Sequence, residues 1–578
     1  MKVYTGTLLA LCALFPQSHS SPLSYHRPPT VVGSFDEIRA AEAVQLCRGA
    51  LVNATQAGAA CPQPQQAVSS LPLFDNITSM SEDCLTLRID RPASTPASAK
   101  LPVLVWIYGG GDTFGQIYDS TYDPTGLVTG AAQKGFPIIY IAMNYRVGIF
   151  GFADSPALAA NDSQNVGLLD QRLALEWVQK HISAFGGDPE RVTIAGESDG
   201  ATAVGLQITA YGGRGHKAPF QRAIMESGSP MADTDTASNI SAVHTAQLTQ
   251  IVNCTASTST AELQCLRALS MQQLNVAAVA YEDAVGGDSG MDVFIPTSPS
   301  SFIPDSPSKL LTTGQFARNI DILGGWNEDD GTFSTLSTIA SSTDVALFLA
   351  ASYPALSSAH IKKALDLYPV SDFSGLSSEN ISAQYFRASQ MQRDAAFACP
   401  SLYMAQMNAQ YATDLATTNY LFALNQTLFR TWYAAANASY LGVSHFSDIP
   451  YVFNQAQGSP RYAAYATAAD RTLSSEISGS WAAFATFGSP SHGNGTITGW
   501  KGFTASPSSL SAATPGAESS HRSHVTNQDD DHYYMQVIGG PDSGIRQIGK
   551  NVTRGGYEEL AARCAFWTSR EIVEALQV

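Results

Sequence analysis

Continuous apolar runs alternate along the chain with segments of helical periodicity. Pro102–Tyr108 and Pro137–Met143 are apolar throughout and of strand length, as is typical of parallel strands covered on both faces. Arg222–Met225 and Ile320–Leu323 have the same character, and Leu168–Ile182 carries its apolar residues at helical spacing. Strands that alternate with helices predict an α/β protein with a large, mostly parallel central sheet flanked by helices.

One short strand leads into a sequence that suits a catalytic serine. Arg191–Ala195 is followed by G-E-S-D-G at 196–200 and then by a helix-forming run. A strand-to-helix turn tight enough to present a serine leaves no room for β-carbons two residues to either side. The pattern predicts Ser198 as a nucleophile. On the motif alone a chance match stays open, since the chain contains 46 glycines.

A serine nucleophile needs a base to take its proton and an acid to orient that base. In parallel-sheet serine hydrolases the chain order is serine, acid, histidine. The histidines after Ser198 are His216, His244, His360, His445, His492, His521, His524 and His532. His445 is the best candidate base, because a loop-like approach and a following apolar run would anchor it. The alternative is a histidine on a surface loop.

Two further segments follow buried strands and suit the remaining roles. Glu328, Asp329 and Asp330 come just after one strand, at the sheet edge where ligands bind, and one of them is the expected acid. The alternative is a solvated acidic turn. Gly109–Gly111 follows another strand, and glycine lets backbone N–H groups approach a developing oxyanion closely. The alternative there is a flexible loop.

The remaining chain fits insertions into one domain rather than further domains. Residues from about 233 to 300 and from 334 to 439 are more helical and polar, without a long apolar strand, and are expected to cover the sheet and shape the substrate pocket. Residues 504–531 are rich in Ser, Pro and Asp and are expected to form a surface loop. A final helix is expected over 557–576. We therefore expect a single domain over 21–578.

The N-terminus and the glycosylation motifs favour export. Residues 1–20 have the layout of a signal peptide, with Lys2, an apolar run and a small-residue end. A buried N-terminal helix is the alternative. Ten Asn-x-Ser/Thr motifs suit a secreted glycoprotein: Asn53, Asn76, Asn161, Asn239, Asn253, Asn380, Asn425, Asn437, Asn494 and Asn551. We expect a secreted protein without a membrane span; retention in the secretory pathway or cell wall is the alternative.

Charge and cysteine content narrow the possible partners. The net charge of -17 disfavours nucleic acid, because phosphate binding depends on Lys and Arg. The cysteine spacings do not resemble a zinc site, and no cofactor or metal is expected. In an oxidising compartment, the seven cysteines beyond the signal segment allow up to three disulfides. Composition does not determine the oligomeric state.

Several motifs in order resemble the type-B carboxylesterase family, the cholinesterase and fungal lipase branch of the α/β-hydrolase fold. The matching segments are S-E-D-C-L-T-L at 81–87, W-I-Y-G-G-G at 106–111, N-Y-R-V-G-I-F-G-F at 144–152, N-V-G-L-L-D-Q-R-L-A-L-E-W-V at 165–178, F-G-G-D-P-E-R-V-T-I-A-G-E-S at 185–198 and S-G-S-P at 227–230. The resemblance extends from about residue 61 to the C-terminus.

The resemblance implies a role for each matching residue. Ser198 corresponds to the nucleophile, His445 to the base and Asp330, directly before a glycine, to the acid. The N–H groups of Gly110, Gly111 and Asp199 correspond to the oxyanion donors, and Ser227 to a hydroxyl beside the acid. The implied disulfides are Cys61–Cys84, Cys254–Cys265 and Cys399–Cys564, and Cys47 has no counterpart.

The chain also departs from the family pattern. Asp199 stands where the family usually has alanine, so a carboxylate adjoins the oxyanion donors. It would be unfavourable there unless it pointed away, although the helix N-terminus could stabilise it. Residues 21–60 match poorly, and absence of part of the sheet edge is one expectation that follows.

The loop between Cys61 and Cys84 limits the substrate. It is rich in proline and polar residues and has no tryptophan, which disfavours both a lipid-binding lid and a cation–π wall for choline esters. The expected activity is a secreted serine carboxylesterase that hydrolyses a small or medium-sized ester or lactone through an acyl-enzyme. The alternatives are an acyl-transfer or lactone-processing enzyme of secondary metabolism and a non-catalytic binding relative.

Overall fold

The computed structural model describes most of the chain after residue 56. The described residues are 57–65, 73–93, 95–215, 217–286, 291–376, 380–504, 533–548 and 559–578, with the backbone of short strands at 3–8, 43–45 and 50–52. Most of the predicted signal segment, the loop at 505–531, and Cys47, Asn53 and Asn551 lie outside these residues.

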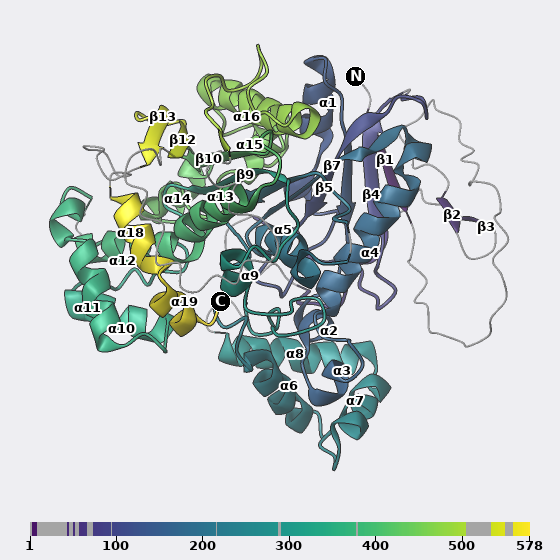
Figure 1. Cartoon of the computed structure of the whole chain (residues 1–578), viewed down its shortest axis with the longest axis vertical. Coiled ribbons are helices and arrows are strands. Elements are labelled where there is room, and N and C mark those ends of the chain that lie inside the picture. Colours follow the sequence, from purple (N-terminus) through teal and green to yellow (C-terminus); the bar gives the residue numbers. More distant parts are fainter. Residues whose placement is uncertain are drawn as a thin grey trace.

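The described strands form one large mixed sheet and a separate two-stranded pair (Figure 1). The order in the large sheet is β1-β4-β6-β5-β7-β8-β9-β10-β12-β13, and β11 pairs with β10. Neighbours from β6 through to β12 are parallel, whereas β1, β4, β11 and β13 pair antiparallel. The bounds are β1 Val3–Leu8, β4 Leu87–Pro92, β5 Leu101–Ile107, β6 Ile139–Met143, β7 Gly187–Glu197, β8 Arg222–Glu226, β9 Asp321–Asn327, β10 Thr418–Leu424, β11 Phe503–Thr504, β12 Tyr533–Ile538 and β13 Gly544–Ile548, with β2 Ala43–Gln45 and β3 Ala50–Val52 as the pair.

The apolar runs form the central strands, as predicted. Every residue of β6 is buried, and β5, β8 and β9 are buried apart from their first residue. Helices on both faces exclude water from a parallel sheet, which explains why these strands lack polar–apolar alternation. The predicted helix is α4 Val166–His181. The prediction of an α/β protein with a large, mostly parallel central sheet flanked by helices is therefore confirmed.

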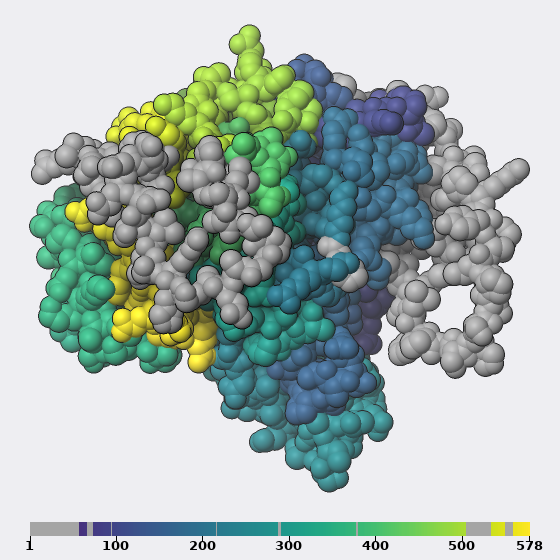
Figure 2. Space-filling model, viewed as in Figure 1, coloured from purple at the N-terminus to yellow at the C-terminus, as the bar shows by residue number. Residues whose placement is uncertain are grey.

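Helices of the two predicted insertions lie in different parts of the molecule, α6–α8 at the bottom and α10–α12 at the left of the view (Figure 1). The first insertion contains α6 Ile240–Ile251, α7 Ser259–Ala268 and α8 Met271–Val285, which project from the body at the lower edge of the space-filling view (Figure 2). The second contains α10 Ser342–Ser352, α11 Ser358–Leu367, α12 Ala383–Arg393 and α13 Cys399–Tyr411. A π-helical turn, Asp394–Ala398, joins α12 to α13.

Two expectations about the C-terminal half were wrong in detail. The range 334–439 was expected to lack a long apolar strand, yet it contains β10, which pairs with β9 and β12 inside the sheet. The strand begins with Thr418 and Asn419, and these polar residues concealed its apolar character in the sequence. The last helix is divided into α18 Leu560–Trp567 and α19 Arg570–Leu576, because the chain leaves helical geometry at Ser569.

Three disulfides join the cysteine pairs that the family resemblance implied. They are Cys61–Cys84, Cys254–Cys265 and Cys399–Cys564. The third joins the start of α13 to α18 and so ties the second insertion to the C-terminal helices. Most of the candidate glycosylation asparagines that the structure describes are exposed: Asn76, Asn161, Asn239, Asn253, Asn380, Asn437 and Asn494, with Asn425 partly buried.

Candidate active site

Ser198 lies at a sharp turn between β7 and α5, which spans Asp199–Thr209. Its backbone has φ 57° and ψ -131°, a conformation that costs a non-glycine residue free energy. A β-carbon at Gly196 would lie 2.4 Å from the Gly200 carbonyl oxygen, and one at Gly200 would lie 2.2 Å from the Ile107 carbonyl oxygen. The two glycines therefore permit the turn, as the sequence predicted.

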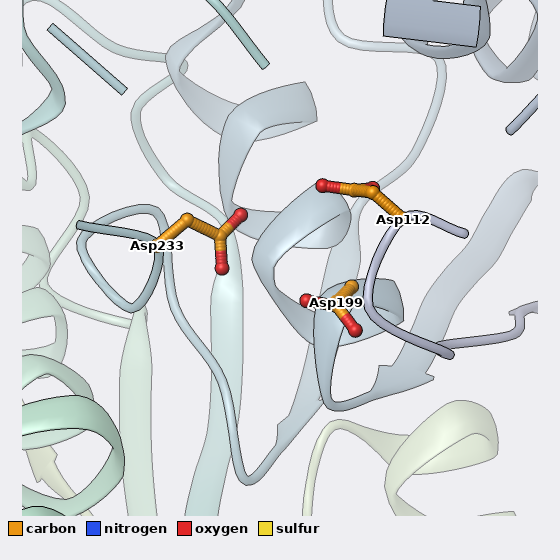
Figure 3. A group of neighbouring side chains, drawn as sticks. All are labelled: Asp112, Asp199 and Asp233. Atoms are coloured by element: carbon orange, nitrogen blue, oxygen red, sulfur yellow. The ribbon is translucent and has the colours of Figure 1, made fainter. Parts of the chain in front are cut away.

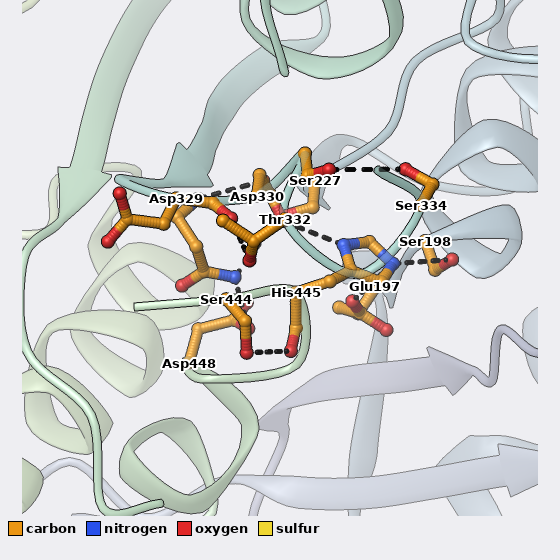
Figure 4. A network of polar contacts seen from close by, with 12 residues as sticks. Glu197, Ser198, Ser227, Asp329, Asp330, Thr332, Ser334, Ser444, His445 and Asp448 are labelled. Carbon is orange, nitrogen blue, oxygen red and sulfur yellow. Dashed lines mark hydrogen bonds and ion pairs between the residues drawn. The ribbon is translucent and has the colours of Figure 1, made fainter. Parts of the chain in front are cut away.

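Ser198, His445 and Asp330 come from distant parts of the chain and form one chain of hydrogen bonds (Figure 4). His445 Nε2 lies 2.9 Å from Ser198 Oγ, and His445 Nδ1 lies 2.7 Å from Asp330 Oδ1. Glu328 and Asp329, the other candidate acids, make no contact with the imidazole in any described hydrogen bond or ion pair. The geometry is that of a nucleophile, a base and an orienting acid.

The carboxylate of Asp330 is held by two further donors. Ser227 Oγ donates to Asp330 Oδ2 at 2.6 Å, and the backbone N–H of Asn327 donates to the same oxygen at 2.9 Å. Asp330 is only 1 % exposed, so these bonds fix the oxygen that does not contact His445. Ser227 occupies the position beside the acid that the family resemblance implied.

His445 lies between aromatic rings and carboxyl groups. Phe397 of the π-helical turn stacks on the imidazole with ring centroids 4.9 Å apart, and the Phe446 ring lies at 4.8 Å. Burial lowers the pKa of His445, but Asp330 and the neighbouring carboxylates outweigh burial and hold the pKa above the ordinary 6.5. Glu197 Oε1 is 3.3 Å from His445 Nε2, and burial raises the pKa of Glu197 well above 4.5.

The side chain of Asp199 accepts hydrogen bonds from two of the backbone N–H groups that were expected to bind an oxyanion. Its Oδ2 accepts the N–H of Gly110 at 3.2 Å and also the N–H of Gly111. Ser198 Oγ lies 3.2 Å from the same oxygen. The carboxylate therefore does not point away, and it competes for two of the three predicted donors. It also competes with His445 for the single hydroxyl proton of Ser198.

Asp112 and Asp233 add further buried acid beside Asp199. A carboxylate oxygen from each of the three residues lies within 4.8 Å of the other two. Burial raises the pKa of Asp112, and the charges of Asp199 and Asp233 raise it further. Burial and Asp199 likewise raise the pKa of Asp233. Burial and mutual repulsion therefore favour the protonated, neutral forms of Asp112 and Asp233.

The loop of the first disulfide contributes an aromatic wall that its sequence did not suggest. The Phe74 ring packs edge-on against Phe446, with centroids 5.1 Å apart, and against Phe114 at 5.2 Å. Phe446 directly follows His445, and Phe114 lies three positions after Gly111. Phe74, Phe114 and Tyr122 also line a small recess beneath the loop. The loop is therefore aromatic at the site although it lacks tryptophan.

Sequence reasoning missed Asp112, Asp233, Glu197 and Phe397. Asp112 directly follows the glycine run and Glu197 directly precedes the nucleophile, so proximity along the chain was a usable signal for both. Asp233 and Phe397 come from segments after β8 and before α13, and only folding brings them to the site.

Comparison with known proteins gives concordant results. The model of the carboxylesterase family matches residues 41–531. An inactive carboxylesterase-like protein of Byssochlamys spectabilis is 39 % identical over 76 % of this chain and 75 % of its own length. A secreted lipase of Arthroderma benhamiae is 35 % identical over 92 % of this chain and 88 % of its own. Within the described residues, no helix is both long and apolar enough to cross a membrane.

Proposed function

The chain belongs to the carboxylesterase family, and from this premise we propose that it is a secreted serine carboxylesterase that acts through an acyl-enzyme on Ser198. Membership of this family, with lipases among its relatives, supports a carboxylic ester hydrolase. The hydrogen-bond chain Ser198–His445–Asp330 is the observation that supports these residues as the catalytic groups.

In the proposed reaction, Ser198 Oγ attacks the ester carbonyl carbon while His445 Nε2 takes the hydroxyl proton. Asp330 stabilises the resulting imidazolium through Nδ1, 2.7 Å away. Collapse of the tetrahedral intermediate breaks the bond to the alcohol oxygen, which receives the proton from His445. Water then repeats the sequence on the acyl-enzyme and releases the acid.

The aromatic side chains around His445 support a substrate with an apolar part. The imidazole is in ring contact with Phe397 and Phe446. Phe74 in turn contacts Phe446. We infer a small or medium-sized ester or lactone with an aryl or alkyl group that packs on these rings.

The decisive experiment measures hydrolysis of 4-nitrophenyl esters of increasing acyl length by wild type, Ser198→Ala and the control Ser257→Ala, which changes an exposed serine. Loss of hydrolysis in Ser198→Ala alone, with organophosphonate labelling of Ser198 in wild type, supports the proposal. Full activity in Ser198→Ala overturns it. Product analysis with a competing alcohol separates hydrolysis from acyl transfer.

A second candidate is a binding protein without turnover. The position of Asp199 on the Gly110 and Gly111 donors favours it, because the oxyanion donors are then not free to stabilise an intermediate. A relative described as inactive is 39 % identical to this chain over 76 % of its length. Absence of both turnover and phosphonate labelling across the ester panel would support this candidate over the first.

Secretion is the other part of the proposal. The exposed sequon asparagines and the name of a secreted lipase relative support it. Expression of the full chain in a fungal host tests it: the proposal requires protein in the medium whose mass falls after treatment with an N-glycosidase. Intracellular, unglycosylated protein overturns it.

A further inference from the structure

The carboxylates of Asp112, Asp199 and Asp233 converge from three separate elements (Figure 3). Asp112 lies on the loop after β5, Asp199 is the first residue of α5, and Asp233 lies on the segment after β8. Figure 3 shows Asp112 and Asp233 on opposite sides of the N-terminal turn of α5, each directing an oxygen inwards. The arrangement is formed by tertiary structure and not by one acidic loop.

Buried oxygens in this cluster lack a donor. Asp112 is only 4 % exposed, and its Oδ2 has no hydrogen-bond partner among the described residues. The same holds for Oδ2 of Asp233, whose Oδ1 accepts a bond of 3.3 Å from Thr202 Oγ1. Buried carboxylate oxygens are ordinarily paired, so these two point to a ligand that brings positive charge or donors.

Among the described residues, lysine and arginine do not neutralise this cluster. No lysine or arginine of the described residues forms an ion pair with any of the three carboxylates. Carboxylates this close repel one another strongly when they are shielded from water. A bound cation would relieve the repulsion.

The spacing and donor type indicate which cation fits. The three oxygens lie within 4.8 Å of one another. Ca²⁺ accepts irregular sets of carboxylate oxygens, whereas Mg²⁺ demands a near-ideal octahedron and gives up its waters reluctantly. Carboxylate oxygens favour such hard cations over zinc or copper. Three carboxylates on separate elements therefore suit Ca²⁺ better than Mg²⁺, because Ca²⁺ imposes the less strict ligand geometry.

We propose that Asp112, Asp199 and Asp233 bind a divalent cation of the Ca²⁺ type, and that binding draws the Asp199 carboxylate away from the N–H groups of Gly110 and Gly111. The cation would then switch the oxyanion donors from an internal carboxylate to the substrate. This second part rests on the proposed esterase function, whereas the binding site itself does not.

Calorimetric titration of CaCl₂ into chelator-treated full-length protein tests the site directly. We expect one ion per chain, and at least tenfold weaker binding in Asp112→Asn and Asp233→Asn. The control Asp283→Asn, which changes an exposed acid on α8, should bind like wild type, and Ser198→Ala should as well. MgCl₂ should bind more weakly than CaCl₂. A rise in Tm on adding CaCl₂ gives a second readout and shows that each variant is folded.

Two results would overturn the cation site: no heat and no Tm shift in wild type, or unchanged affinity in both Asp112→Asn and Asp233→Asn.

For the coupling, kcat of wild type should rise about tenfold or more from EDTA to CaCl₂, and Asp199→Ala should not respond. Stoichiometric binding without a change in kcat overturns the coupling. Binding without any ester hydrolysis overturns the proposed function and leaves the cation site standing.

Discussion

The contacts of Asp199 determine how well this site can stabilise an oxyanion. The adjacent serine is well placed for attack, since His445 Nε2 lies 2.9 Å from its hydroxyl. Yet Asp199 Oδ2 accepts the N–H groups of Gly110 and Gly111, which are the proposed oxyanion donors. Nucleophile activation and oxyanion stabilisation are thus separable in this protein, and substitution can test them independently.

Replacing Asp199 by alanine should free both glycine N–H groups. One oxyanion donor typically contributes a factor of ~10²–10³ in rate, so kcat for a short aryl ester in EDTA should rise roughly 10- to 100-fold. Asp199→Asn is the matched control, because it removes the charge but keeps a side chain of the same size. A fall in kcat for Asp199→Ala would show that the carboxylate assists the reaction.

The surroundings of His445 predict the pH dependence of activity. The imidazole must be neutral to accept the serine proton, and its pKa is held above 6.5 by Asp330 and nearby carboxylates despite burial. The rate constant kcat/KM should therefore rise with pH through an apparent pKa above 6.5. Asp330→Asn should shift this rise of kcat/KM to lower pH and reduce kcat by about 10³–10⁴. An unchanged apparent pKa in Asp330→Asn would contradict the proposed pairing of His445 with Asp330.

At the scale of elements, the site depends on how closely the β7–α5 turn approaches β5. A β-carbon at Gly109 would lie 2.4 Å from the Glu197 carbonyl oxygen and 2.8 Å from the Ser198 β-carbon. The glycine loop and the nucleophile turn are therefore in backbone contact. Such contact places the oxyanion donors accurately, but it leaves no space for side chains.

Gly200→Ala tests this packing, because its β-carbon would lie 2.2 Å from the backbone oxygen of Ile107. We expect the free energy of unfolding to fall by roughly 1–3 kcal/mol or more, with loss of hydrolysis. Gly375→Ala is the control, since a β-carbon there meets no atom within 4 Å. Urea unfolding of both variants measures the difference. Equal stability of the two would contradict the close approach.

At the scale of the whole molecule, buried acids outside the triad accompany a net charge of -17. Burial raises the pKa of Glu282 on α8 to about 8 and that of Asp119 to about 6. Groups of this kind stay protonated in the folded protein at pH values where the unfolded chain has lost the proton. Folding is then progressively disfavoured as the pH rises.

The free energy of unfolding should therefore be greater at pH 5 than at pH 8. The contribution of Glu282 is fully present below 4.5, its unfolded pKa, and is lost as the pH rises through about 8. Glu282→Gln should flatten the decline, by at most about 1.4 kcal/mol for each unit of pKa shift. The control Glu176→Gln, which changes an exposed acid, should leave the decline of the free energy of unfolding with pH unchanged. Denaturant unfolding between pH 5 and pH 8 measures this dependence. A free energy of unfolding that rises towards pH 8 would refute the prediction.

The sequence by itself determined the sheet and the identity of the groups that meet at its edge. Continuous apolar runs of strand length are typical of strands covered on both faces, which is why β5, β6, β8 and β9 were predictable. The glycines around Ser198 followed from the lack of space in a strand-to-helix turn. β10 was missed because its first residues are polar.

The tertiary structure decided where the side chains point and which distant residues join them. No local pattern specifies that Asp199 turns towards Gly110 and Gly111, because that orientation depends on the backbone of another strand. Asp233 and Phe397 likewise reach the site only through folding of the insertions. Residue chemistry is a property of the sequence, whereas proximity across the chain, and hence the electrostatic environment of Ser198, exists only in the folded protein.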